Sequence, residues 1–139
     1  MKIMHFILAM AIAVAVSSGR AEEDIDTIPA QEAARAWLAI VDAGAYGDSW
    51  EQGAKAFQEK VPKADWEKAL VAARGAMGKL VLRKTRSVNY AKSLPNAPEG
   101  EYVVIQYETV FENRTSIETV TPMRGKDGGP WKVSGYFIK

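Results

Sequence analysis

The sequence predicts an α+β domain in which three N-terminal helices pack on a curved antiparallel sheet of about four strands. Two observations lead to this fold class. Before Gly78, apolar residues recur at helical spacing in three successive segments, and after it they alternate with polar residues along most of the chain. The last three alternating segments are separated by short turns, which predicts that consecutive strands pair with one another.

Each expected helix carries one apolar stripe. The first begins at Thr27-Ile28-Pro29, where proline suits the first helical turn, and ends at Gly44. A capping box from Asp48 to Glu51 is expected to start the second, which Pro62 closes, and Gly78 closes the third. The stripes consist of Ala34, Trp37, Leu38 and Val41, then Trp50, Ala54, Phe57 and Val61, and finally Trp66, Leu70, Ala73 and Met77.

The expected strands follow as four segments rich in β-branched and aromatic residues. They span residues 80–89, 101–112, 115–123 and 131–138. A proline- and glycine-containing loop at 93–100 joins the first two, and turns at 113–114 and 126–129 join the others. The second strand should place one face in the core, formed by Val103, Ile105, Tyr107, Thr109 and Phe111.

The N-terminus has the pattern of a secretory signal peptide. Lys2 precedes an unbroken apolar run at 6–16, small residues follow, and the chain turns acidic at 22–24. Gly19 and Ala21 fit a cleavage site, so we expect cleavage after Ala21. A membrane span needs about 20 apolar residues, more than this run has, so we expect no membrane attachment after cleavage. The expected product is periplasmic or secreted, with a signal peptide at 1–21, a flexible acidic lead at 22–29 and one domain at 30–139.

The expected mature domain lacks both cysteine and histidine. The chain has no cysteine, and its single histidine, His5, lies within the expected signal peptide. This composition excludes disulfides, Ser-His-Asp triads and zinc sites with nitrogen or sulfur ligands from that domain. We expect no metal and no cofactor, and any catalysis would have to use carboxylates, tyrosine, lysine or arginine.

The expected mature domain is also nearly neutral. The full chain has 18 basic and 17 acidic residues, and loss of Lys2 and Arg20 leaves 16 basic against 17 acidic. Nucleic-acid-binding domains usually carry a concentrated positive charge, so we expect no nucleic-acid partner.

Scattered residues form a long, ordered pattern over residues 30–139. Its first half comprises Trp37-Leu38, Val41-Asp42, Tyr46, Ser49-Trp50, Trp66, Arg74, Gly78 and Arg83, and its second half Leu94-Pro95, Pro98, segments 99–104 and 118–121, Thr109, Phe111, Asp127-Gly128, Trp131, Val133 and Gly135-Tyr136. The pattern resembles a bacterial family of short exported proteins whose domain has no assigned function. That resemblance implies a bacterial source and export, and it implies no activity.

The expected architecture is also similar to the cone-shaped nuclear-transport-factor-like and cystatin-like folds. Those folds host isomerases, dehydratases, binding modules and interaction domains, so the architecture does not select among these functions.

Aromatic residues supply most of the candidate ligand-binding positions, which are Trp37, Trp50, Tyr46 and Trp131, together with Arg83. Aromatic side chains and a few polar groups commonly line small-molecule pockets. The alternative is that the aromatic residues fill the core between helices and sheet, and we favour this alternative because aromatic side chains dominate core burial.

Glu118 is the candidate catalytic residue, and Tyr107, Tyr136 and Arg74 are its candidate partners. A carboxylate beside a tyrosine is the proton-transfer arrangement of ketosteroid-isomerase-like enzymes. The alternative is a structural ion pair between Glu118 and Arg74 or Arg83, which we favour because such pairs perturb carboxylates as readily as active sites do.

Asp42 and Asp48 flank a short glycine-containing link at residues 43–47. We expect them to cap helices rather than to bind a cation, because their spacing matches no calcium-binding loop.

Three functions are compatible with these residues. The favoured one is a non-enzymatic periplasmic accessory domain that binds a small ligand or an envelope protein. The second is a histidine-free isomerase or hydrolase that uses the Glu118 group, and the third is an interaction module that forms a homodimer through the exposed face of its sheet.

Overall fold

The computed structural model describes residues 25–139 of the protein. The expected signal peptide, its cleavage after Ala21 and the first part of the acidic lead lie outside the described residues. Within residues 25–139, no helix is both long and apolar enough to cross a membrane.

The longest helix, α2, spans Ile28–Asp42 and presents one apolar stripe to the sheet. It begins two residues inside the lead that we expected to be flexible, because Pro29 in its first turn is preset for helical geometry and the Gln31 N–H bonds to the Thr27 carbonyl. Its buried residues are Ala30, Ala34, Trp37, Leu38 and Val41, which include the whole predicted stripe.

The second expected helix is divided into α3 (Tyr46–Glu51) and α4 (Lys55–Lys60). The break falls at Gly53 and Ala54, where Ala54 adopts an extended conformation and its N–H bonds to the Val133 carbonyl of the last strand. A hydrogen bond to the sheet therefore replaces a helical one. The expected capping box does not form, because α3 begins at Tyr46 and Glu51 instead pairs with Lys63 of α5 (Lys63–Gly75).

The sheet consists of β1 (Leu80–Ala91), β2 (Glu101–Phe111), β3 (Thr115–Gly125) and β4 (Gly128–Ile138). All neighbouring pairs are antiparallel and follow sequence order. The last strand begins earlier than expected because Gly128 and Gly129 adopt positive φ angles of 93° and 95°, which lets the tight turn pass directly into the β3–β4 ladder.

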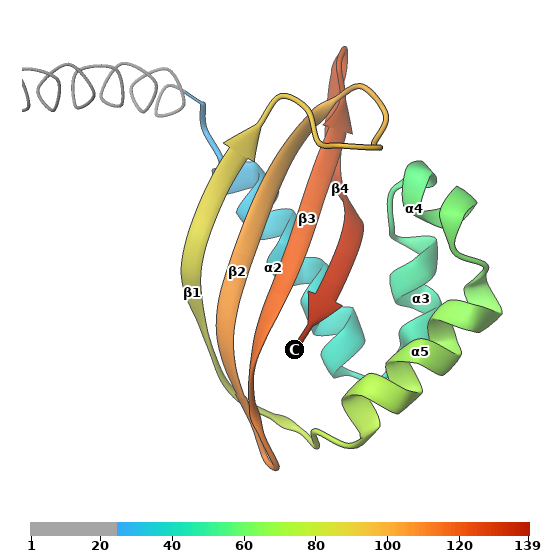
Figure 1. The fold of residues 1–139 in the computed structure, drawn as a ribbon, viewed down its shortest axis with the longest axis vertical. Helices are drawn as coiled ribbons and strands as arrows, with labels where there is room; N and C mark the ends of the chain where they lie inside the picture. Colours follow the sequence, from blue (N-terminus) through green and yellow to red (C-terminus); the bar gives the residue numbers. More distant parts are fainter. Residues whose placement is uncertain (1–24) are drawn as a thin grey trace, which may run out of the picture.

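One face of the curved sheet is covered by helices, and α2 runs behind the strands in the view of Figure 1. The core between these layers joins the α2 stripe to Phe57, Trp66 and Leu70 and to inward residues of the sheet such as Val103 and Ile105. The α+β class predicted from the sequence is confirmed. On the opposite face, the loop at 92–100 folds over one end of the sheet, where Leu94 and Ala97 pack against Tyr102.

Candidate functional site

Glu118 lies on β3 inside the domain, with 0% of its surface exposed. Its Oε1 accepts hydrogen bonds from Arg83 Nε at 2.7 Å and Thr109 Oγ1 at 2.5 Å. Its Oε2 accepts from Arg83 Nη2 at 3.2 Å and from the Tyr136 hydroxyl. A carboxylate has about four acceptor positions, so these four donors occupy the whole group.

Arg83 connects this carboxylate to helix α2. Its Nη1 and Nη2 donate to the two oxygens of Asp42 at 2.8 and 3.0 Å, so the guanidinium is held between Asp42 and Glu118. Four of its five N–H donors are thereby used. Because Asp42 ends α2 and Glu118 lies on β3, the two ion pairs fasten the helix to the sheet.

Arg74, at the end of α5, binds the same network from the other side. Its Nη2 donates to Asp42 Oδ1 at 2.8 Å, and its guanidinium lies 4.7 Å from the centre of the Phe111 ring. Its Nε and Nη1 have no partner among the described residues. The expectation that Asp42 caps a helix is therefore wrong, because its carboxylate is engaged by the buried Arg74 and the partly buried Arg83.

The network alters the pKa values of its members. Burial works against ionisation of Asp42, but hydrogen bonds from Arg83 and Arg74 outweigh it and hold the pKa of Asp42 below its ordinary value. Burial also opposes the charged form of Arg83, and its bonds to Asp42 and Glu118 nevertheless raise its pKa. Burial and the neighbouring Glu118 raise the pKa of Tyr136, so its hydroxyl remains a donor at neutral pH.

The predicted aromatic residues pack mainly into the core. Trp37 lies 6.1 Å from Trp66 and 5.4 Å from Tyr136 between ring centres. The indole N–H groups of Trp37 and Trp66 bond to the carbonyl and the hydroxyl of Ser49. Trp50 is half-buried and donates to the Val61 carbonyl at 2.7 Å. These contacts support the core-filling interpretation.

Two other predicted ligand-binding residues lie at the edge of this core. Tyr46 is partly buried against it and accepts a bond from the Ser49 hydroxyl through its carbonyl. Trp131 is buried on β4, and the Arg124 guanidinium lies 4.7 Å from its ring centre. The contacts of both residues are to other parts of the same domain.

A cleft of about 290 Å³ opens between α2 and β1, beside the charged network. Five of its six lining residues carry a polar or charged group, and the six come from three elements. The residues are Arg35, Ala39 and Asp42 of α2, Arg83 and Thr85 of β1, and Tyr107 of β2. We call it the α2–β1 cleft.

Tyr107 is the unusual member of this lining. The residue is 98% buried, and its hydroxyl has no hydrogen-bond partner among the described residues. The Arg83 guanidinium lies 5.9 Å from its ring centre. Burial raises the pKa of the hydroxyl, while the positive charges of Arg35 and Arg83 act in the opposite direction. A neutral, buried hydroxyl without a partner is costly, by about 1–3 kcal/mol.

Arg35 forms the rim of the cleft. Its side chain is exposed, and within residues 25–139 it pairs with no carboxylate. The cleft therefore combines one available guanidinium with one available hydroxyl, both of which can donate to a ligand.

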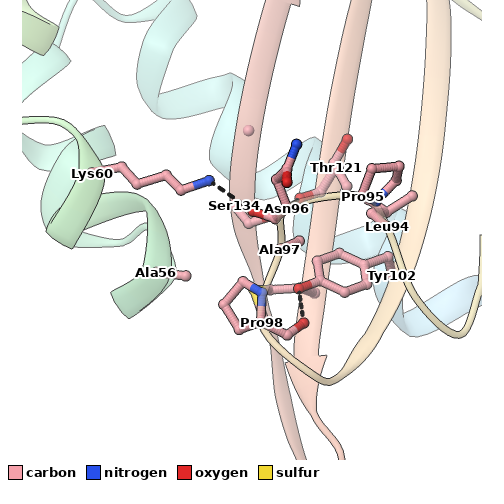
Figure 2. A pocket seen from close by; sticks show the side chains of 12 residues that line it. Ala56, Lys60, Leu94, Pro95, Asn96, Ala97, Pro98, Tyr102, Thr121 and Ser134 are labelled. Carbon is pink, nitrogen blue, oxygen red and sulfur yellow. Dashed lines mark hydrogen bonds between the residues drawn. The ribbon is translucent and has the colours of Figure 1, made fainter.

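A second pocket, of about 240 Å³, lies between α4, the 92–100 loop and the sheet (Figure 2). Its lining is mainly apolar, from residues such as Leu94, Pro98 and Tyr102. Its polar groups largely bond to the main chain, since Tyr102 donates to the Pro98 carbonyl at 2.5 Å and Lys60 to the Asn96 carbonyl at 3.3 Å. Unlike the α2–β1 cleft, it presents no buried polar side chain without a partner.

The structure brings together Glu118, Tyr136, Arg83 and, through Asp42, Arg74. Tyr107 lies opposite Glu118 on the neighbouring strand, and its hydroxyl makes no bond to that carboxylate.

The sequence reasoning missed Arg35 and the pairing of Asp42. The available signal was the spacing of positions 35, 39 and 42, which lie on one side of α2 beside the buried stripe. Among residues 25–139, no group of three or more Asp, Glu, His or Cys side chains is arranged to hold a metal.

Comparison with known proteins identifies the family. The model of a family described as "protein of unknown function (DUF4019)" matches residues 33–136. The chain belongs to this family. The match confirms the resemblance inferred from the scattered sequence pattern, over nearly the same range. No curated protein and no solved structure matches the chain. The bacterial source and the likeness to nuclear-transport-factor-like and cystatin-like folds stay predictions.

Proposed function

We propose that this protein is an exported, non-enzymatic binding domain that holds a small anion in the α2–β1 cleft. The observation that carries the proposal is the buried Tyr107 hydroxyl, which has no partner among the described residues and belongs to a residue that lines the cleft beside the unpaired Arg35. A ligand oxygen that accepts from both groups would satisfy the hydroxyl and neutralise the guanidinium.

The charge around the cleft favours a monoanion. Three arginines, Arg35, Arg74 and Arg83, surround two carboxylates, those of Asp42 and Glu118, which leaves one positive charge in excess. Asp42 itself lines the cleft and would repel a second negative charge on the ligand. A small carboxylate matches this balance better than a phosphate dianion does.

The contacts of Glu118 weigh against the alternative of proton-transfer catalysis. A general base needs a free acceptor position within reach of a substrate. All four acceptor positions of Glu118 are taken by Arg83, Thr109 and Tyr136, and the residue has no exposed surface. We therefore assign the Glu118 network to holding α2 on the sheet, where it fixes one wall of the cleft.

Export is proposed from the N-terminal sequence pattern alone, which lies outside the described residues. An exported small domain without an evident catalytic group is well suited to binding a solute or an envelope component. Fractionation of cells that produce the full chain, with mass spectrometry of its N-terminus, tests this part. Export predicts a mature chain that begins at Glu22 outside the cytoplasm, and an intact N-terminus in the cytoplasm would contradict it.

Isothermal titration calorimetry with acetate, benzoate and inorganic phosphate tests the binding part. We expect saturable binding of the carboxylates with Kd in the range of about 10 µM to 1 mM, and weaker binding of phosphate. Arg35→Gln and Tyr107→Phe should each weaken carboxylate binding by about tenfold or more, because each removes one donor to the ligand.

Arg114→Gln is the matched control, since it removes the same charge from an exposed turn. It should leave carboxylate binding unchanged. The proposal is wrong if no carboxylate binds, or if Arg114→Gln weakens binding as much as Arg35→Gln does.

A further inference from the structure

The face of the sheet opposite α2 carries an apolar band that crosses all four strands. The band consists of Leu82 on β1, Val110 on β2, Ile117 on β3 and Phe137 on β4. We call it the outer band. Leu82 and Phe137 are 54% and 59% exposed, so a large part of the band contacts solvent.

Strand register places these side chains on one face. Leu82 pairs with Val110, and Ile117 lies diagonally next to Val110 because its partner on β2 is Glu108. Phe137 pairs with Thr119, two residues from Ile117 on the same face. Alternate side chains of a strand point to opposite faces.

The residues adjacent to the band confirm this orientation, because the side chains of Arg83, Thr109, Glu118 and Tyr136 all meet inside the domain.

The described elements leave this part of the face uncovered. The 92–100 loop covers the other end of the face, where Leu94 and Ala97 pack on Tyr102 (Figure 1). In that view, no helix within residues 25–139 lies in front of the strands. A contiguous exposed apolar surface on a small domain commonly marks an interaction site.

We propose that the outer band binds the same band of a second copy of this chain, with the two sheets packed face to face. Charge supports this choice of partner. Beside the band, Lys84 and Glu108 form a cross-strand pair on the outer face. A pair of opposite charges is self-complementary under a two-fold rotation, which would set Lys84 of each copy near Glu108 of the other. A net charge of +1 for the full chain, or of −1 with 16 basic and 17 acidic residues after cleavage, also creates little repulsion between copies.

The size of the surface predicts a weak dimer. Four strands spaced about 4.8 Å apart, with about 11 residues each at about 3.3 Å per residue, give a face of roughly 700 Å². The loop covers one end of it, so the contact is smaller than the roughly 800 Å² that each partner buries in a standard stable complex. We therefore expect a Kd of about 10–100 µM.

Sedimentation velocity from about 5 to 500 µM protein tests the proposal, because mass action should shift the population from monomer to dimer over that range. Phe137→Ser and Leu82→Ser should each raise the dimer Kd at least about tenfold. Val71→Ser is the matched control, since Val71 is 60% exposed on α5, away from the sheet, and this change should not alter association.

Charge exchange provides a second measurement that leaves the apolar band intact. Lys84→Glu alone should weaken the dimer, and the exchange Lys84→Glu with Glu108→Lys should restore it. A protein that remains monomeric at 500 µM would overturn the proposal, and so would a dimer that Phe137→Ser and Leu82→Ser do not weaken. The proposal would also be overturned if the chain stayed monomeric and bound a different protein.

Discussion

Glu118 and Tyr107 face each other across β3 and β2, and they have opposite hydrogen-bond environments. Every acceptor position of the Glu118 carboxylate is occupied by a protein donor. The Tyr107 hydroxyl has no partner, although the residue is as deeply buried. These neighbouring buried polar groups thus differ in whether they can still form a hydrogen bond. A fully bonded group holds the fold together, and an unbonded one beside a cleft is available to a ligand.

The largest expected effect on stability comes from a change to the fully hydrogen-bonded Glu118. Glu118→Gln should lower the free energy of unfolding by about 3 kcal/mol or more, because it removes a fully buried charge and leaves the partly buried Arg83 with only one of its two carboxylates. Urea denaturation followed by tryptophan fluorescence measures the change. Glu101→Gln is the control, since the Glu101–Arg124 pair is partly exposed and should contribute less than about 1 kcal/mol. Equal losses in the two variants would show that burial of the network has no special importance.

The next effect separates the two tyrosines. Tyr136→Phe should destabilise the domain by about 2 kcal/mol, because its hydroxyl donates to the buried Glu118 carboxylate. The raised pKa of Tyr136 means that the folded state holds the phenolic proton more tightly than the unfolded chain does. Its contribution to stability is therefore complete below pH 10 and declines as pH rises above that value. Urea midpoints measured between pH 8 and pH 11 should fall more steeply in the wild type than in Tyr136→Phe.

Acid should weaken the same network through Asp42. The pKa of Asp42 is lower in the folded state than its ordinary value of 3.8. Its contribution to stability is therefore present above pH 3.8 and is lost as pH falls through the folded-state pKa. Acid titration of the wild type and Asp42→Asn, monitored by far-ultraviolet circular dichroism, should show a steeper loss in the wild type below about pH 4. Parallel curves would mean that the two arginines do not lower the pKa of Asp42.

The smallest expected effect on stability is that of Tyr107→Phe. Without ligand, removal of the unbonded hydroxyl should raise the free energy of unfolding by about 1 kcal/mol, because the variant no longer buries a polar group without a partner. Urea denaturation in a buffer without carboxylate ions measures this. A loss comparable to that of Tyr136→Phe would reveal a hydrogen bond at Tyr107 and would remove the contrast between the two tyrosines.

Much of the fold follows from sequence periodicity, because the stripe of α2 and the alternation of β2 agree with their burial. In α5, Trp66 and Leu70 are buried as predicted, but Arg74 is buried in place of Ala73. The division into α3 and α4 does not follow from periodicity. That break depends on the bond from the Ala54 N–H to Val133, which is almost 80 residues away in the chain and is fixed only when the sheet has formed.

The candidate site was less accessible to sequence reasoning. The type of each residue indicated that Glu118 would meet an arginine or a tyrosine, and the ion pair with Arg83 agrees with the favoured alternative. The residue types did not show that Asp42 would join the network or that Arg35 would remain unpaired. Both facts depend on how α2 crosses the sheet, which is a property of tertiary packing and not of local pattern.

The most direct test compares the two tyrosines in one titration. Protein with ¹³C at the ζ carbon of tyrosine should give one NMR signal for each of its five tyrosines, assigned through Tyr→Phe variants. As acetate or benzoate is added, we predict a saturable shift of the Tyr107 signal, because its hydroxyl gains a partner, and a constant Tyr136 signal, because Glu118 already occupies it. An unchanged Tyr107 signal, or an equal shift at Tyr136, would contradict the assignment of the α2–β1 cleft as the binding site.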